Sequence, residues 1–138
     1  MFHACGIFYN PDTRSVLLQK RDDKAPVNPN KWCLFGGGSE GDETPEQTFI
    51  REMKEELNIE LKLEDLKKFT NYLNPKFNTH RYVYLVESRA DKSSMTLNEG
   101  EDFDWISLDR VFEYDLTEST ARDVKTFLSK LDDSSILR

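Results

Sequence analysis

The amino-acid sequence predicts one α/β or α+β sandwich, in which a single sheet is covered by helices. Three observations lead to this prediction: several short segments have strand-like apolar patterns, one helix lies in the middle of the chain, and another lies near its end. Of the 138 residues, 37% are hydrophobic and 12% aromatic. That composition supports one core, and the length leaves no room for a second domain, so residues 1–138 are expected to form a single domain.

The first elements are predicted to be strands. Phe2–Tyr9 and Ser15–Lys20 are rich in apolar residues, and the turn residues Asn10-Pro11-Asp12 between them predict a hairpin or meander. The polar segment Arg21–Lys31 contains two prolines and is predicted to be a loop. After it, Trp32–Phe35 is a short predicted strand that runs into three consecutive glycines.

The central helix has the clearest sequence signal. Thr44-Pro45-Glu46-Gln47 is a capping box with proline at the first helical position, which predicts a helix from Pro45 to about Leu57. Asn58 follows as its expected terminator, because asparagine tolerates the left-handed conformation better than most residues.

Three more strands are predicted in the second half of the chain. Lys68–Leu73 and Arg81–Val86 are expected to pair around a turn at Asn74-Pro75, and Asp102–Ile106 is a last short strand.

A second helix is predicted near the end of the chain, with Thr117 as its N-cap. Its apolar face follows the i, i+3, i+4 rule and contains Ala121, Val124, Phe127, Leu128 and Leu131. Asp132–Arg138 is expected to be a frayed tail.

The net charge is −7, from 19 Lys and Arg against 26 Asp and Glu. Most of it lies in residues 40–60, where eight acids meet two bases. Such an acidic chain is a poor binder of polyanions, which argues against a nucleic-acid partner. A concentrated negative charge either faces water or holds a cation.

The chain is expected to be cytoplasmic. Its longest apolar run, Tyr82–Val86, is far too short to span a bilayer, so no membrane partner is predicted. Met1–Asn10 has neither a basic region nor a long apolar stretch, which argues against a secretion signal. Cys5 and Cys33 are too few for a disulfide scaffold and lack metal-ligand spacing, so reduced thiols are expected.

The central helix carries an acidic face beside its apolar one. Its expected core positions are Phe49, Ile50, Met53 and Leu57. Glu52, Glu55 and Glu56 stand at i, i+3 and i+4, where like charges cost roughly 0.2–0.5 kcal/mol per pair. Arg51 reaches Glu55, but one arginine cannot neutralise three acids. A solvated face is the common explanation of such a pattern. Here the acids border the apolar face and follow a glycine-rich loop, which favours Mg²⁺ or Mn²⁺ binding.

These residues resemble the Nudix box, G-x5-E-x7-R-E-U-x-E-E-x-G-U, where U is aliphatic. Gly37 is followed after five residues by Glu43, and after seven more by the segment Arg51–Ile59. Asn58 replaces the last glycine and can supply the same left-handed cap. Lys31-Trp32 and Trp105–Leu108 are also similar to the usual surroundings of the box, so the resemblance extends over most of the chain.

Membership of this family implies an α/β/α sandwich, with a mixed sheet flanked by helices, that uses Mg²⁺ to cleave a diphosphate linked to another moiety. Carried over to this sequence, the metal-binding groups are the side chains of Glu52, Glu55 and Glu56, with assistance from Glu43 and a backbone carbonyl near Gly37. Arg51 is implied to orient the glutamates by ion pairing.

The general base stays open at this point. The hydrolysis needs a carboxylate that accepts a proton from water. In the family this is either a box glutamate, here Glu55 or Glu56, or a loop glutamate, for which Glu99 is the candidate and Glu101 the competitor.

The substrate-binding residues are less defined by the sequence. Arg21 stands where some relatives keep a phosphate contact. Four aromatic residues are candidates for stacking on a base or for ordinary core packing, and the sequence does not decide between them: Phe8, Tyr72, Phe77 and Tyr82. His3 and Cys5 share a strand face and are expected to be packing residues, because no third group orients them for catalysis.

The leading hypothesis is a Mg²⁺-dependent pyrophosphohydrolase of a nucleoside di- or triphosphate or a derivative, a description that includes a MutT-like enzyme that clears damaged nucleotides. A nucleotide-sugar or dinucleotide diphosphatase is the enzymatic alternative, and a non-catalytic nucleotide sensor is the alternative of another class. The complete set of box acids counts against the sensor. A monomer and a homodimer are both compatible with the sequence.

Overall fold

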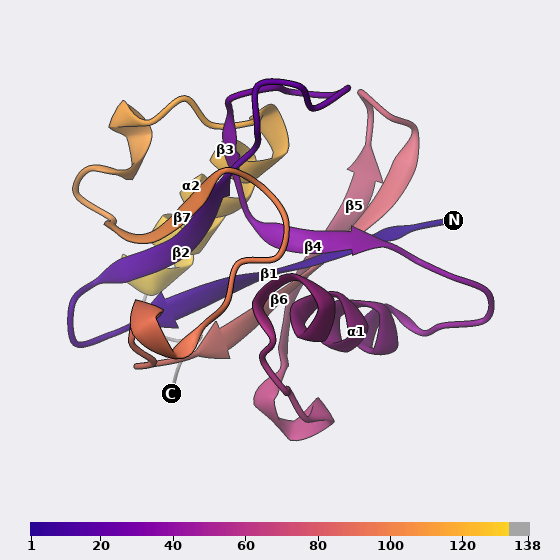
Figure 1. Ribbon diagram of the computed structural model, residues 1–138, viewed down its shortest axis with the longest axis horizontal. Helices are drawn as coiled ribbons and strands as arrows, with labels where there is room; N and C mark the ends of the chain where they lie inside the picture. Colours follow the sequence, from indigo (N-terminus) through magenta and orange to yellow (C-terminus); the bar gives the residue numbers. More distant parts are fainter. Residues whose placement is uncertain (133–138) are drawn as a thin grey trace.

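The computed structural model describes residues 1–132, which form seven strands and two α-helices (Figure 1). The strands are β1 (His3–Asn10), β2 (Ser15–Lys20), β3 (Trp32–Cys33), β4 (Phe35–Gly38), β5 (Lys67–Asn74), β6 (Thr79–Glu87) and β7 (Asp102–Ser107). The helices are α1 (Pro45–Leu57) and α2 (Glu118–Asp132). Asp132 closes α2 and so is not part of a tail, and the remainder of the predicted tail lies outside the described residues.

All seven strands belong to one mixed sheet. β1 lies in its middle and runs parallel to β6, which pairs in turn with β5 in the predicted antiparallel hairpin. β1 and β2 form the predicted hairpin, but they pair only at its tip, at Tyr9–Val16 and Asn10–Ser15. Beyond these pairs the two strands diverge, and the chain from β3 to β4 fills the fork between them (Figure 1).

The strand predicted at Trp32–Phe35 is therefore wrong in its extent. It breaks at Leu34, where the chain leaves β2 as β3 and joins β1 as β4. The glycines after it are themselves part of β4, because Gly36, Gly37 and Gly38 pair with the first half of β1. A run without side chains has no apolar alternation, so the sequence pattern could not show that it was a strand.

The helices cover opposite faces of the sheet, which confirms the predicted sandwich. Side chains alternate along β1, so that Cys5 and Ile7 pack toward α2, whereas Ala4 and Phe8 pack toward α1. The α1 core contains Phe49, Met53 and Leu57, and the α2 core contains Val124 and Phe127. Each helix thus closes one of two hydrophobic layers.

The helix caps are as predicted. The Thr44 hydroxyl accepts from the backbone N–H of Gln47 at 3.2 Å, and the Gln47 side chain accepts from the Thr44 N–H at 2.9 Å. Asn58 ends α1 in the left-handed conformation, with φ of 55°. At α2, the Thr117 hydroxyl accepts from the N–H of Thr120 at 3.3 Å. These caps fix where the acidic face of α1 begins and ends.

Within residues 1–132, neither α1 nor α2 is long and apolar enough to cross a membrane.

Candidate active site

The acidic face of α1 lies directly against β4. A Cβ atom built on Gly37 would stand 2.3 Å from both Cδ and Oε1 of Glu52, a distance that no real side chain tolerates. Only glycine allows the Glu52 carboxylate to come this close to the strand. The structure thus brings together the first residue of the Nudix box and one of its predicted metal ligands, which are fifteen residues apart in the sequence.

Arg51 connects these acids to the strand. Its Nη1 atom donates to Glu52 at 3.1 Å and, as predicted, to Glu55 at 3.2 Å. Its Nη2 atom donates to the backbone carbonyl of Gly38 at 3.0 Å. Its Nε and Nη2 atoms donate to the two carboxylate oxygens of Glu43, at 2.7 and 3.0 Å. One guanidinium therefore fixes β4, the loop after it and one turn of α1.

Glu43 is almost fully engaged by hydrogen bonds. Besides Arg51, its Oε1 atom accepts from the Glu40 N–H at 2.8 Å and from the Thr48 hydroxyl at 2.9 Å. These donors, Arg51 first among them, lower the pKa of Glu43 to about 2. The hydrogen bonds make Glu43 the anchor of Arg51, while its predicted assistance to a metal ion stays a prediction.

Glu56 is the buried member of the acidic face, with only 3% of its surface exposed. The Nε2 atom of Gln19 donates to its Oε2 atom at 3.2 Å. Burial raises the pKa of Glu56 well above its usual range, and the hydrogen bond to the Glu52 carboxyl and the charges of Glu52 and Glu99 raise it further. Two carboxyl groups in contact cannot both ionise cheaply, so this pair either retains a proton or requires a cation.

The three box acids do not form a closed ligand set in this structure. Among residues 1–132, no three His, Cys, Asp or Glu side chains converge as a metal site. The carboxylate of Glu55 is 56% exposed and turns to Arg51, the nearest positive charge. The available donors nevertheless fit a hard divalent cation, because the Glu52 carboxylate lies against Gly37 and is in contact with the carboxyl group of Glu56. All three predicted ligands stay predictions.

A cleft of about 510 Å³ opens beside Glu56, and Glu99 lines it as well. The Asn98 side chain places this loop by donating to the carbonyl of Glu55 at 2.7 Å, and the Asn98 N–H donates to the carbonyl of Glu56 at 2.8 Å. Glu101, the competing loop glutamate, pairs instead with Lys20 at 3.1 Å. Sequence reasoning missed both Asn98 and the Gln19 contact to Glu56, because no spacing rule connects these residues to the box.

A second cavity, of about 480 Å³, continues from this cleft. Three residues line both spaces: Gln19, Arg21 and Gly36. The predicted phosphate contact Arg21 thus lies at the junction, where its Nε atom donates to the carbonyl of Val27 at 2.8 Å. Of the four aromatic residues considered for stacking, Phe77 lines this cavity, whereas Phe8 is buried in the α1 core.

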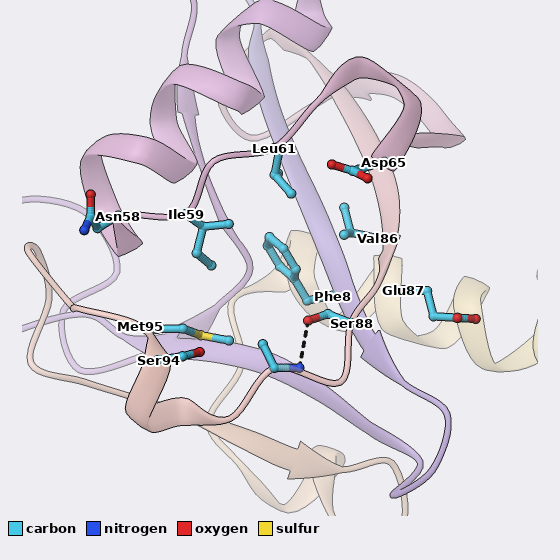
Figure 2. A pocket seen from close by; sticks show the side chains of 11 residues that line it. Phe8, Asn58, Ile59, Leu61, Asp65, Val86, Glu87, Ser88, Ser94 and Met95 are labelled. Carbon is cyan, nitrogen blue, oxygen red and sulfur yellow. Dashed lines mark hydrogen bonds between the residues drawn. The ribbon is translucent and has the colours of Figure 1, made fainter.

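Another hollow, of about 530 Å³, lies beyond the C-terminal end of α1 (Figure 2). Its apolar wall includes Ile59, Leu61 and Met95, and its acidic lining residues are Asp65 and Glu87. Phe8, one of the four stacking candidates, lines it, but none of the predicted metal-binding or catalytic residues does, so the chemistry expected from the Nudix box belongs to the cleft beside Glu56.

Comparison with known proteins agrees with the resemblance to the box. The family model described as NUDIX domain matches residues 2–128. The chain is 28% identical over 132 residues to the nucleoside triphosphatase NudI of Escherichia coli O139:H28, covering 88% of this chain and 92% of that protein. It is 30% identical over 129 residues to NudI of Escherichia fergusonii, covering 86% of this chain and 90% of that protein.

Solved structures share the fold. The NUDIX domain of Shewanella oneidensis NrtR, in complex with ADP-ribose, superposes with a TM-score of 0.76 at 16% identity, over 95% of this chain and 88% of that one. The MutT NUDIX hydrolase of Burkholderia pseudomallei superposes with a TM-score of 0.72 at 23% identity, over 91% and 95%. With the Nudix box, the matching family and this fold together, the chain belongs to the Nudix hydrolases and acts on phosphoanhydride bonds.

Proposed function

We propose that this enzyme hydrolyses a phosphoanhydride bond of a nucleoside triphosphate or a close derivative, with Mg²⁺ as its cofactor and Mn²⁺ as a possible substitute. One observation carries the proposal: buried Glu56, in contact with Glu52, lines a cleft that continues into a second cavity. That arrangement suits a polyphosphate joined to a nucleoside. The related NudI proteins are named nucleoside triphosphatases, which supports the same substrate class.

In the proposed site, Glu52, Glu55 and Glu56 hold the cation together with a backbone carbonyl near Gly37. When bound, a divalent cation lowers the pKa of a water molecule and offsets negative charge on the phosphoryl oxygens. Arg51 keeps Glu52 and Glu55 at fixed positions through its hydrogen bonds at 3.1 and 3.2 Å. Glu43 keeps its predicted assistance to the cation as a proposal, and its hydrogen bonds at 2.7 and 3.0 Å also fix Arg51.

Glu99 is the proposed general base. It lines the cleft beside Glu56, whereas Glu101 is paired with Lys20. The attacking water gives its proton to the Glu99 carboxylate while its oxygen bonds to phosphorus. The bond between phosphorus and the bridging oxygen breaks and the bridging oxygen keeps the electron pair, so that the products are either a nucleoside monophosphate and pyrophosphate or a nucleoside diphosphate and phosphate. Arg21 lines both the cleft and the cavity, which supports its proposed contact with the polyphosphate.

A substrate panel with matched variants tests this function. The purified protein is incubated with Mg²⁺ and ribo- and deoxynucleoside triphosphates, nucleotide sugars and dinucleotides, and the products are separated by chromatography. We expect release of phosphate or pyrophosphate from nucleoside triphosphates, and its loss in Glu55→Gln and Glu56→Gln. Glu60→Gln is the control, because Glu60 pairs with Lys54 at 3.0 Å away from the cleft.

Two results would contradict the proposal. If Glu55→Gln and Glu56→Gln both turned over at the wild-type rate, Glu55 and Glu56 would not hold the cation. Tight nucleotide binding by the wild-type protein, without hydrolysis of any compound in the panel, would favour the nucleotide-sensing alternative. Circular dichroism of each variant shows whether a loss of turnover occurs in a folded protein.

A further inference from the structure

A buried polar cluster forms part of the lining of the 480 Å³ cavity. Arg81, on β6, is only 7% exposed and donates from Nε to the Oδ2 atom of Asp123, on α2, at 2.9 Å. The Tyr72 hydroxyl, on β5, donates to the other carboxylate oxygen of Asp123 at 2.7 Å. Three elements of the fold therefore meet on one ion pair. The hydrophobic pattern of α2 gave no sign of Asp123, which is fully buried.

The ion pair leaves part of the Arg81 guanidinium available. A guanidinium has five N–H donors, and Nε provides only one of them. Within residues 1–132, the structure shows no hydrogen bond from either Nη atom of Arg81, and Arg81 lines the cavity. Since Asp123 balances its charge, this part of the cavity presents fixed N–H donors without a net positive charge.

His3 lies beside Arg81, its partner in the pairing of β1 with β6, and lines the same cavity. Its Nδ1 atom is buried and has no hydrogen-bond partner. Buried polar atoms in folded proteins are rarely left unpaired. Burial, with the charges of Arg81 and Arg21, lowers the pKa of His3 to about 4, so its ring is neutral at neutral pH. A polar group on a bound ligand would satisfy it.

The rim of the cavity is apolar. Val27 and Phe77 line it and are 42% and 46% exposed. They come from different loops, the one before β3 and the one between β5 and β6. The Lys76 ammonium joins these loops by donating to Asn28 Oδ1 at 3.2 Å. An exposed aromatic ring at the mouth of a cavity with polar groups inside suits a flat, polar-edged ring that stacks on Phe77.

On the basis of the proposed function, we propose that this cavity holds the nucleobase, and that Arg81 selects bases that present a carbonyl oxygen to it. The Nη groups only donate, so they pair with a carbonyl oxygen, as guanidinium groups do with guanine. An exocyclic amino group in the same place would leave those donors unpaired, which is costly in a buried site. Adenine has no carbonyl oxygen and is the base most disfavoured. A phosphate is a poorer occupant, because Asp123 cancels the charge that would attract it.

Asp123 and Tyr72 are positioning residues in this proposal. They do not touch the base, since both oxygens of Asp123 are occupied by Arg81 and Tyr72. Their effect is to hold the guanidinium at one place and one angle. Removing one of their hydrogen bonds should reduce the discrimination between bases more than it reduces the overall affinity for nucleotides.

Inosine and adenosine triphosphates provide a matched pair, because they share the ribose triphosphate and differ only at position 6, a carbonyl or an amino group, and in the proton that N1 carries beside the carbonyl. Binding is measured by calorimetry in Mg²⁺ with analogues of the two nucleotides whose bridging oxygens are replaced by methylene groups, so that the result does not depend on hydrolysis. The protein can bind ITP selectively without hydrolysing any compound of the substrate panel, and it can hydrolyse nucleotides without selecting between bases. The two proposals can therefore fail independently. We expect ITP to bind the wild-type protein at least about tenfold more tightly than ATP. Equal affinities, or no measurable binding of either nucleotide, would overturn the proposal.

Variants then assign the selectivity to the cluster. The double change Arg81→Gln with Asp123→Asn keeps a neutral hydrogen-bonding pair and should bring the ITP-to-ATP ratio close to one. Tyr72→Phe should lower the ratio by about two- to tenfold through loss of one hydrogen bond. Phe77→Ala is the control, because it should weaken both nucleotides and leave the ratio unchanged. If the double variant does not fold, Tyr72→Phe decides, and an unchanged ratio in that variant refutes the role of Arg81.

Discussion

Replacing Gly37 by alanine should lower the activity without lowering the stability of the fold. The new Cβ would lie 2.3 Å from Cδ of Glu52, whereas ordinary carbon contacts begin near 3.4 Å. The carboxylate must therefore retreat by about 1 Å. A displacement of that size in a catalytic group costs on the order of 100-fold in rate, which corresponds to about 2.7 kcal/mol of transition-state stabilisation. The fold should not suffer, because alanine is favoured over glycine in a strand by about 0.5–1 kcal/mol.

Gly38→Ala is the matched control on the same strand. A Cβ atom there meets only the flexible side chain of Met1, with Sδ at 3.1 Å. The assay is kcat/KM for the best nucleotide of the substrate panel over a Mg²⁺ titration, together with the melting temperature of each variant. We expect Gly37→Ala to lose activity, to need more Mg²⁺, and to melt no lower than wild type. If Gly37→Ala and Gly38→Ala have the same kcat/KM within about twofold, the close approach of Glu52 to Gly37 has no catalytic role.

Three further predictions concern the same site. EDTA should abolish turnover, and added Mg²⁺ or Mn²⁺ should restore it. Turnover that persists in EDTA would show that the reaction does not need a divalent cation. Arg51→Lys removes the two-pronged contact to Glu43 and should cost about 1.5–3 kcal/mol in kcat/KM, measured beside a melting curve. Glu56→Gln should change the pH dependence of stability. Because the pKa of Glu56 rises from 4.5 toward 9 on folding, the metal-free wild type is favoured while this group is protonated and loses stability between those values. Its melting temperature should fall more from pH 5 to pH 8 than that of Glu56→Gln, and parallel curves would contradict this.

The sequence predicted the elements whose signals are local. The start and end of α1 follow from the Thr44 capping box and from Asn58, and both depend only on residues within one turn. The acidic face follows from helical spacing, which sets Glu52, Glu55 and Glu56 on neighbouring positions whatever packs against the helix. The strands with clear apolar patterns were found for the same reason.

Features that depend on distant parts of the chain could not be predicted. The break at Leu34 exists because β1 and β2 diverge, and divergence has no sequence signature. The contact of Gln19 with Glu56 joins residues 37 positions apart. The burial of Asp123 has no signal in the sequence, because a buried carboxylate is rare without a partner and its partner Arg81 lies on another element.

The charges of the site bear on how substrate can enter it. Arg51 forms ion pairs with Glu43, Glu52 and Glu55, and these acids already offset its single positive charge. The cleft beyond it is lined by Glu56 and Glu99, and the one arginine in its lining is Arg21, at the far junction with the second cavity. A bare polyphosphate would meet three carboxyl groups there, because Asp22 also lines the cleft, and those that are ionised repel it strongly in a partly desolvated space. The polyphosphate is therefore expected to enter together with divalent cations, and the acids that repel the free anion then attract its metal complex. On this argument the acidic face of α1 explains both the need for a cation and the exclusion of free anions from the cleft.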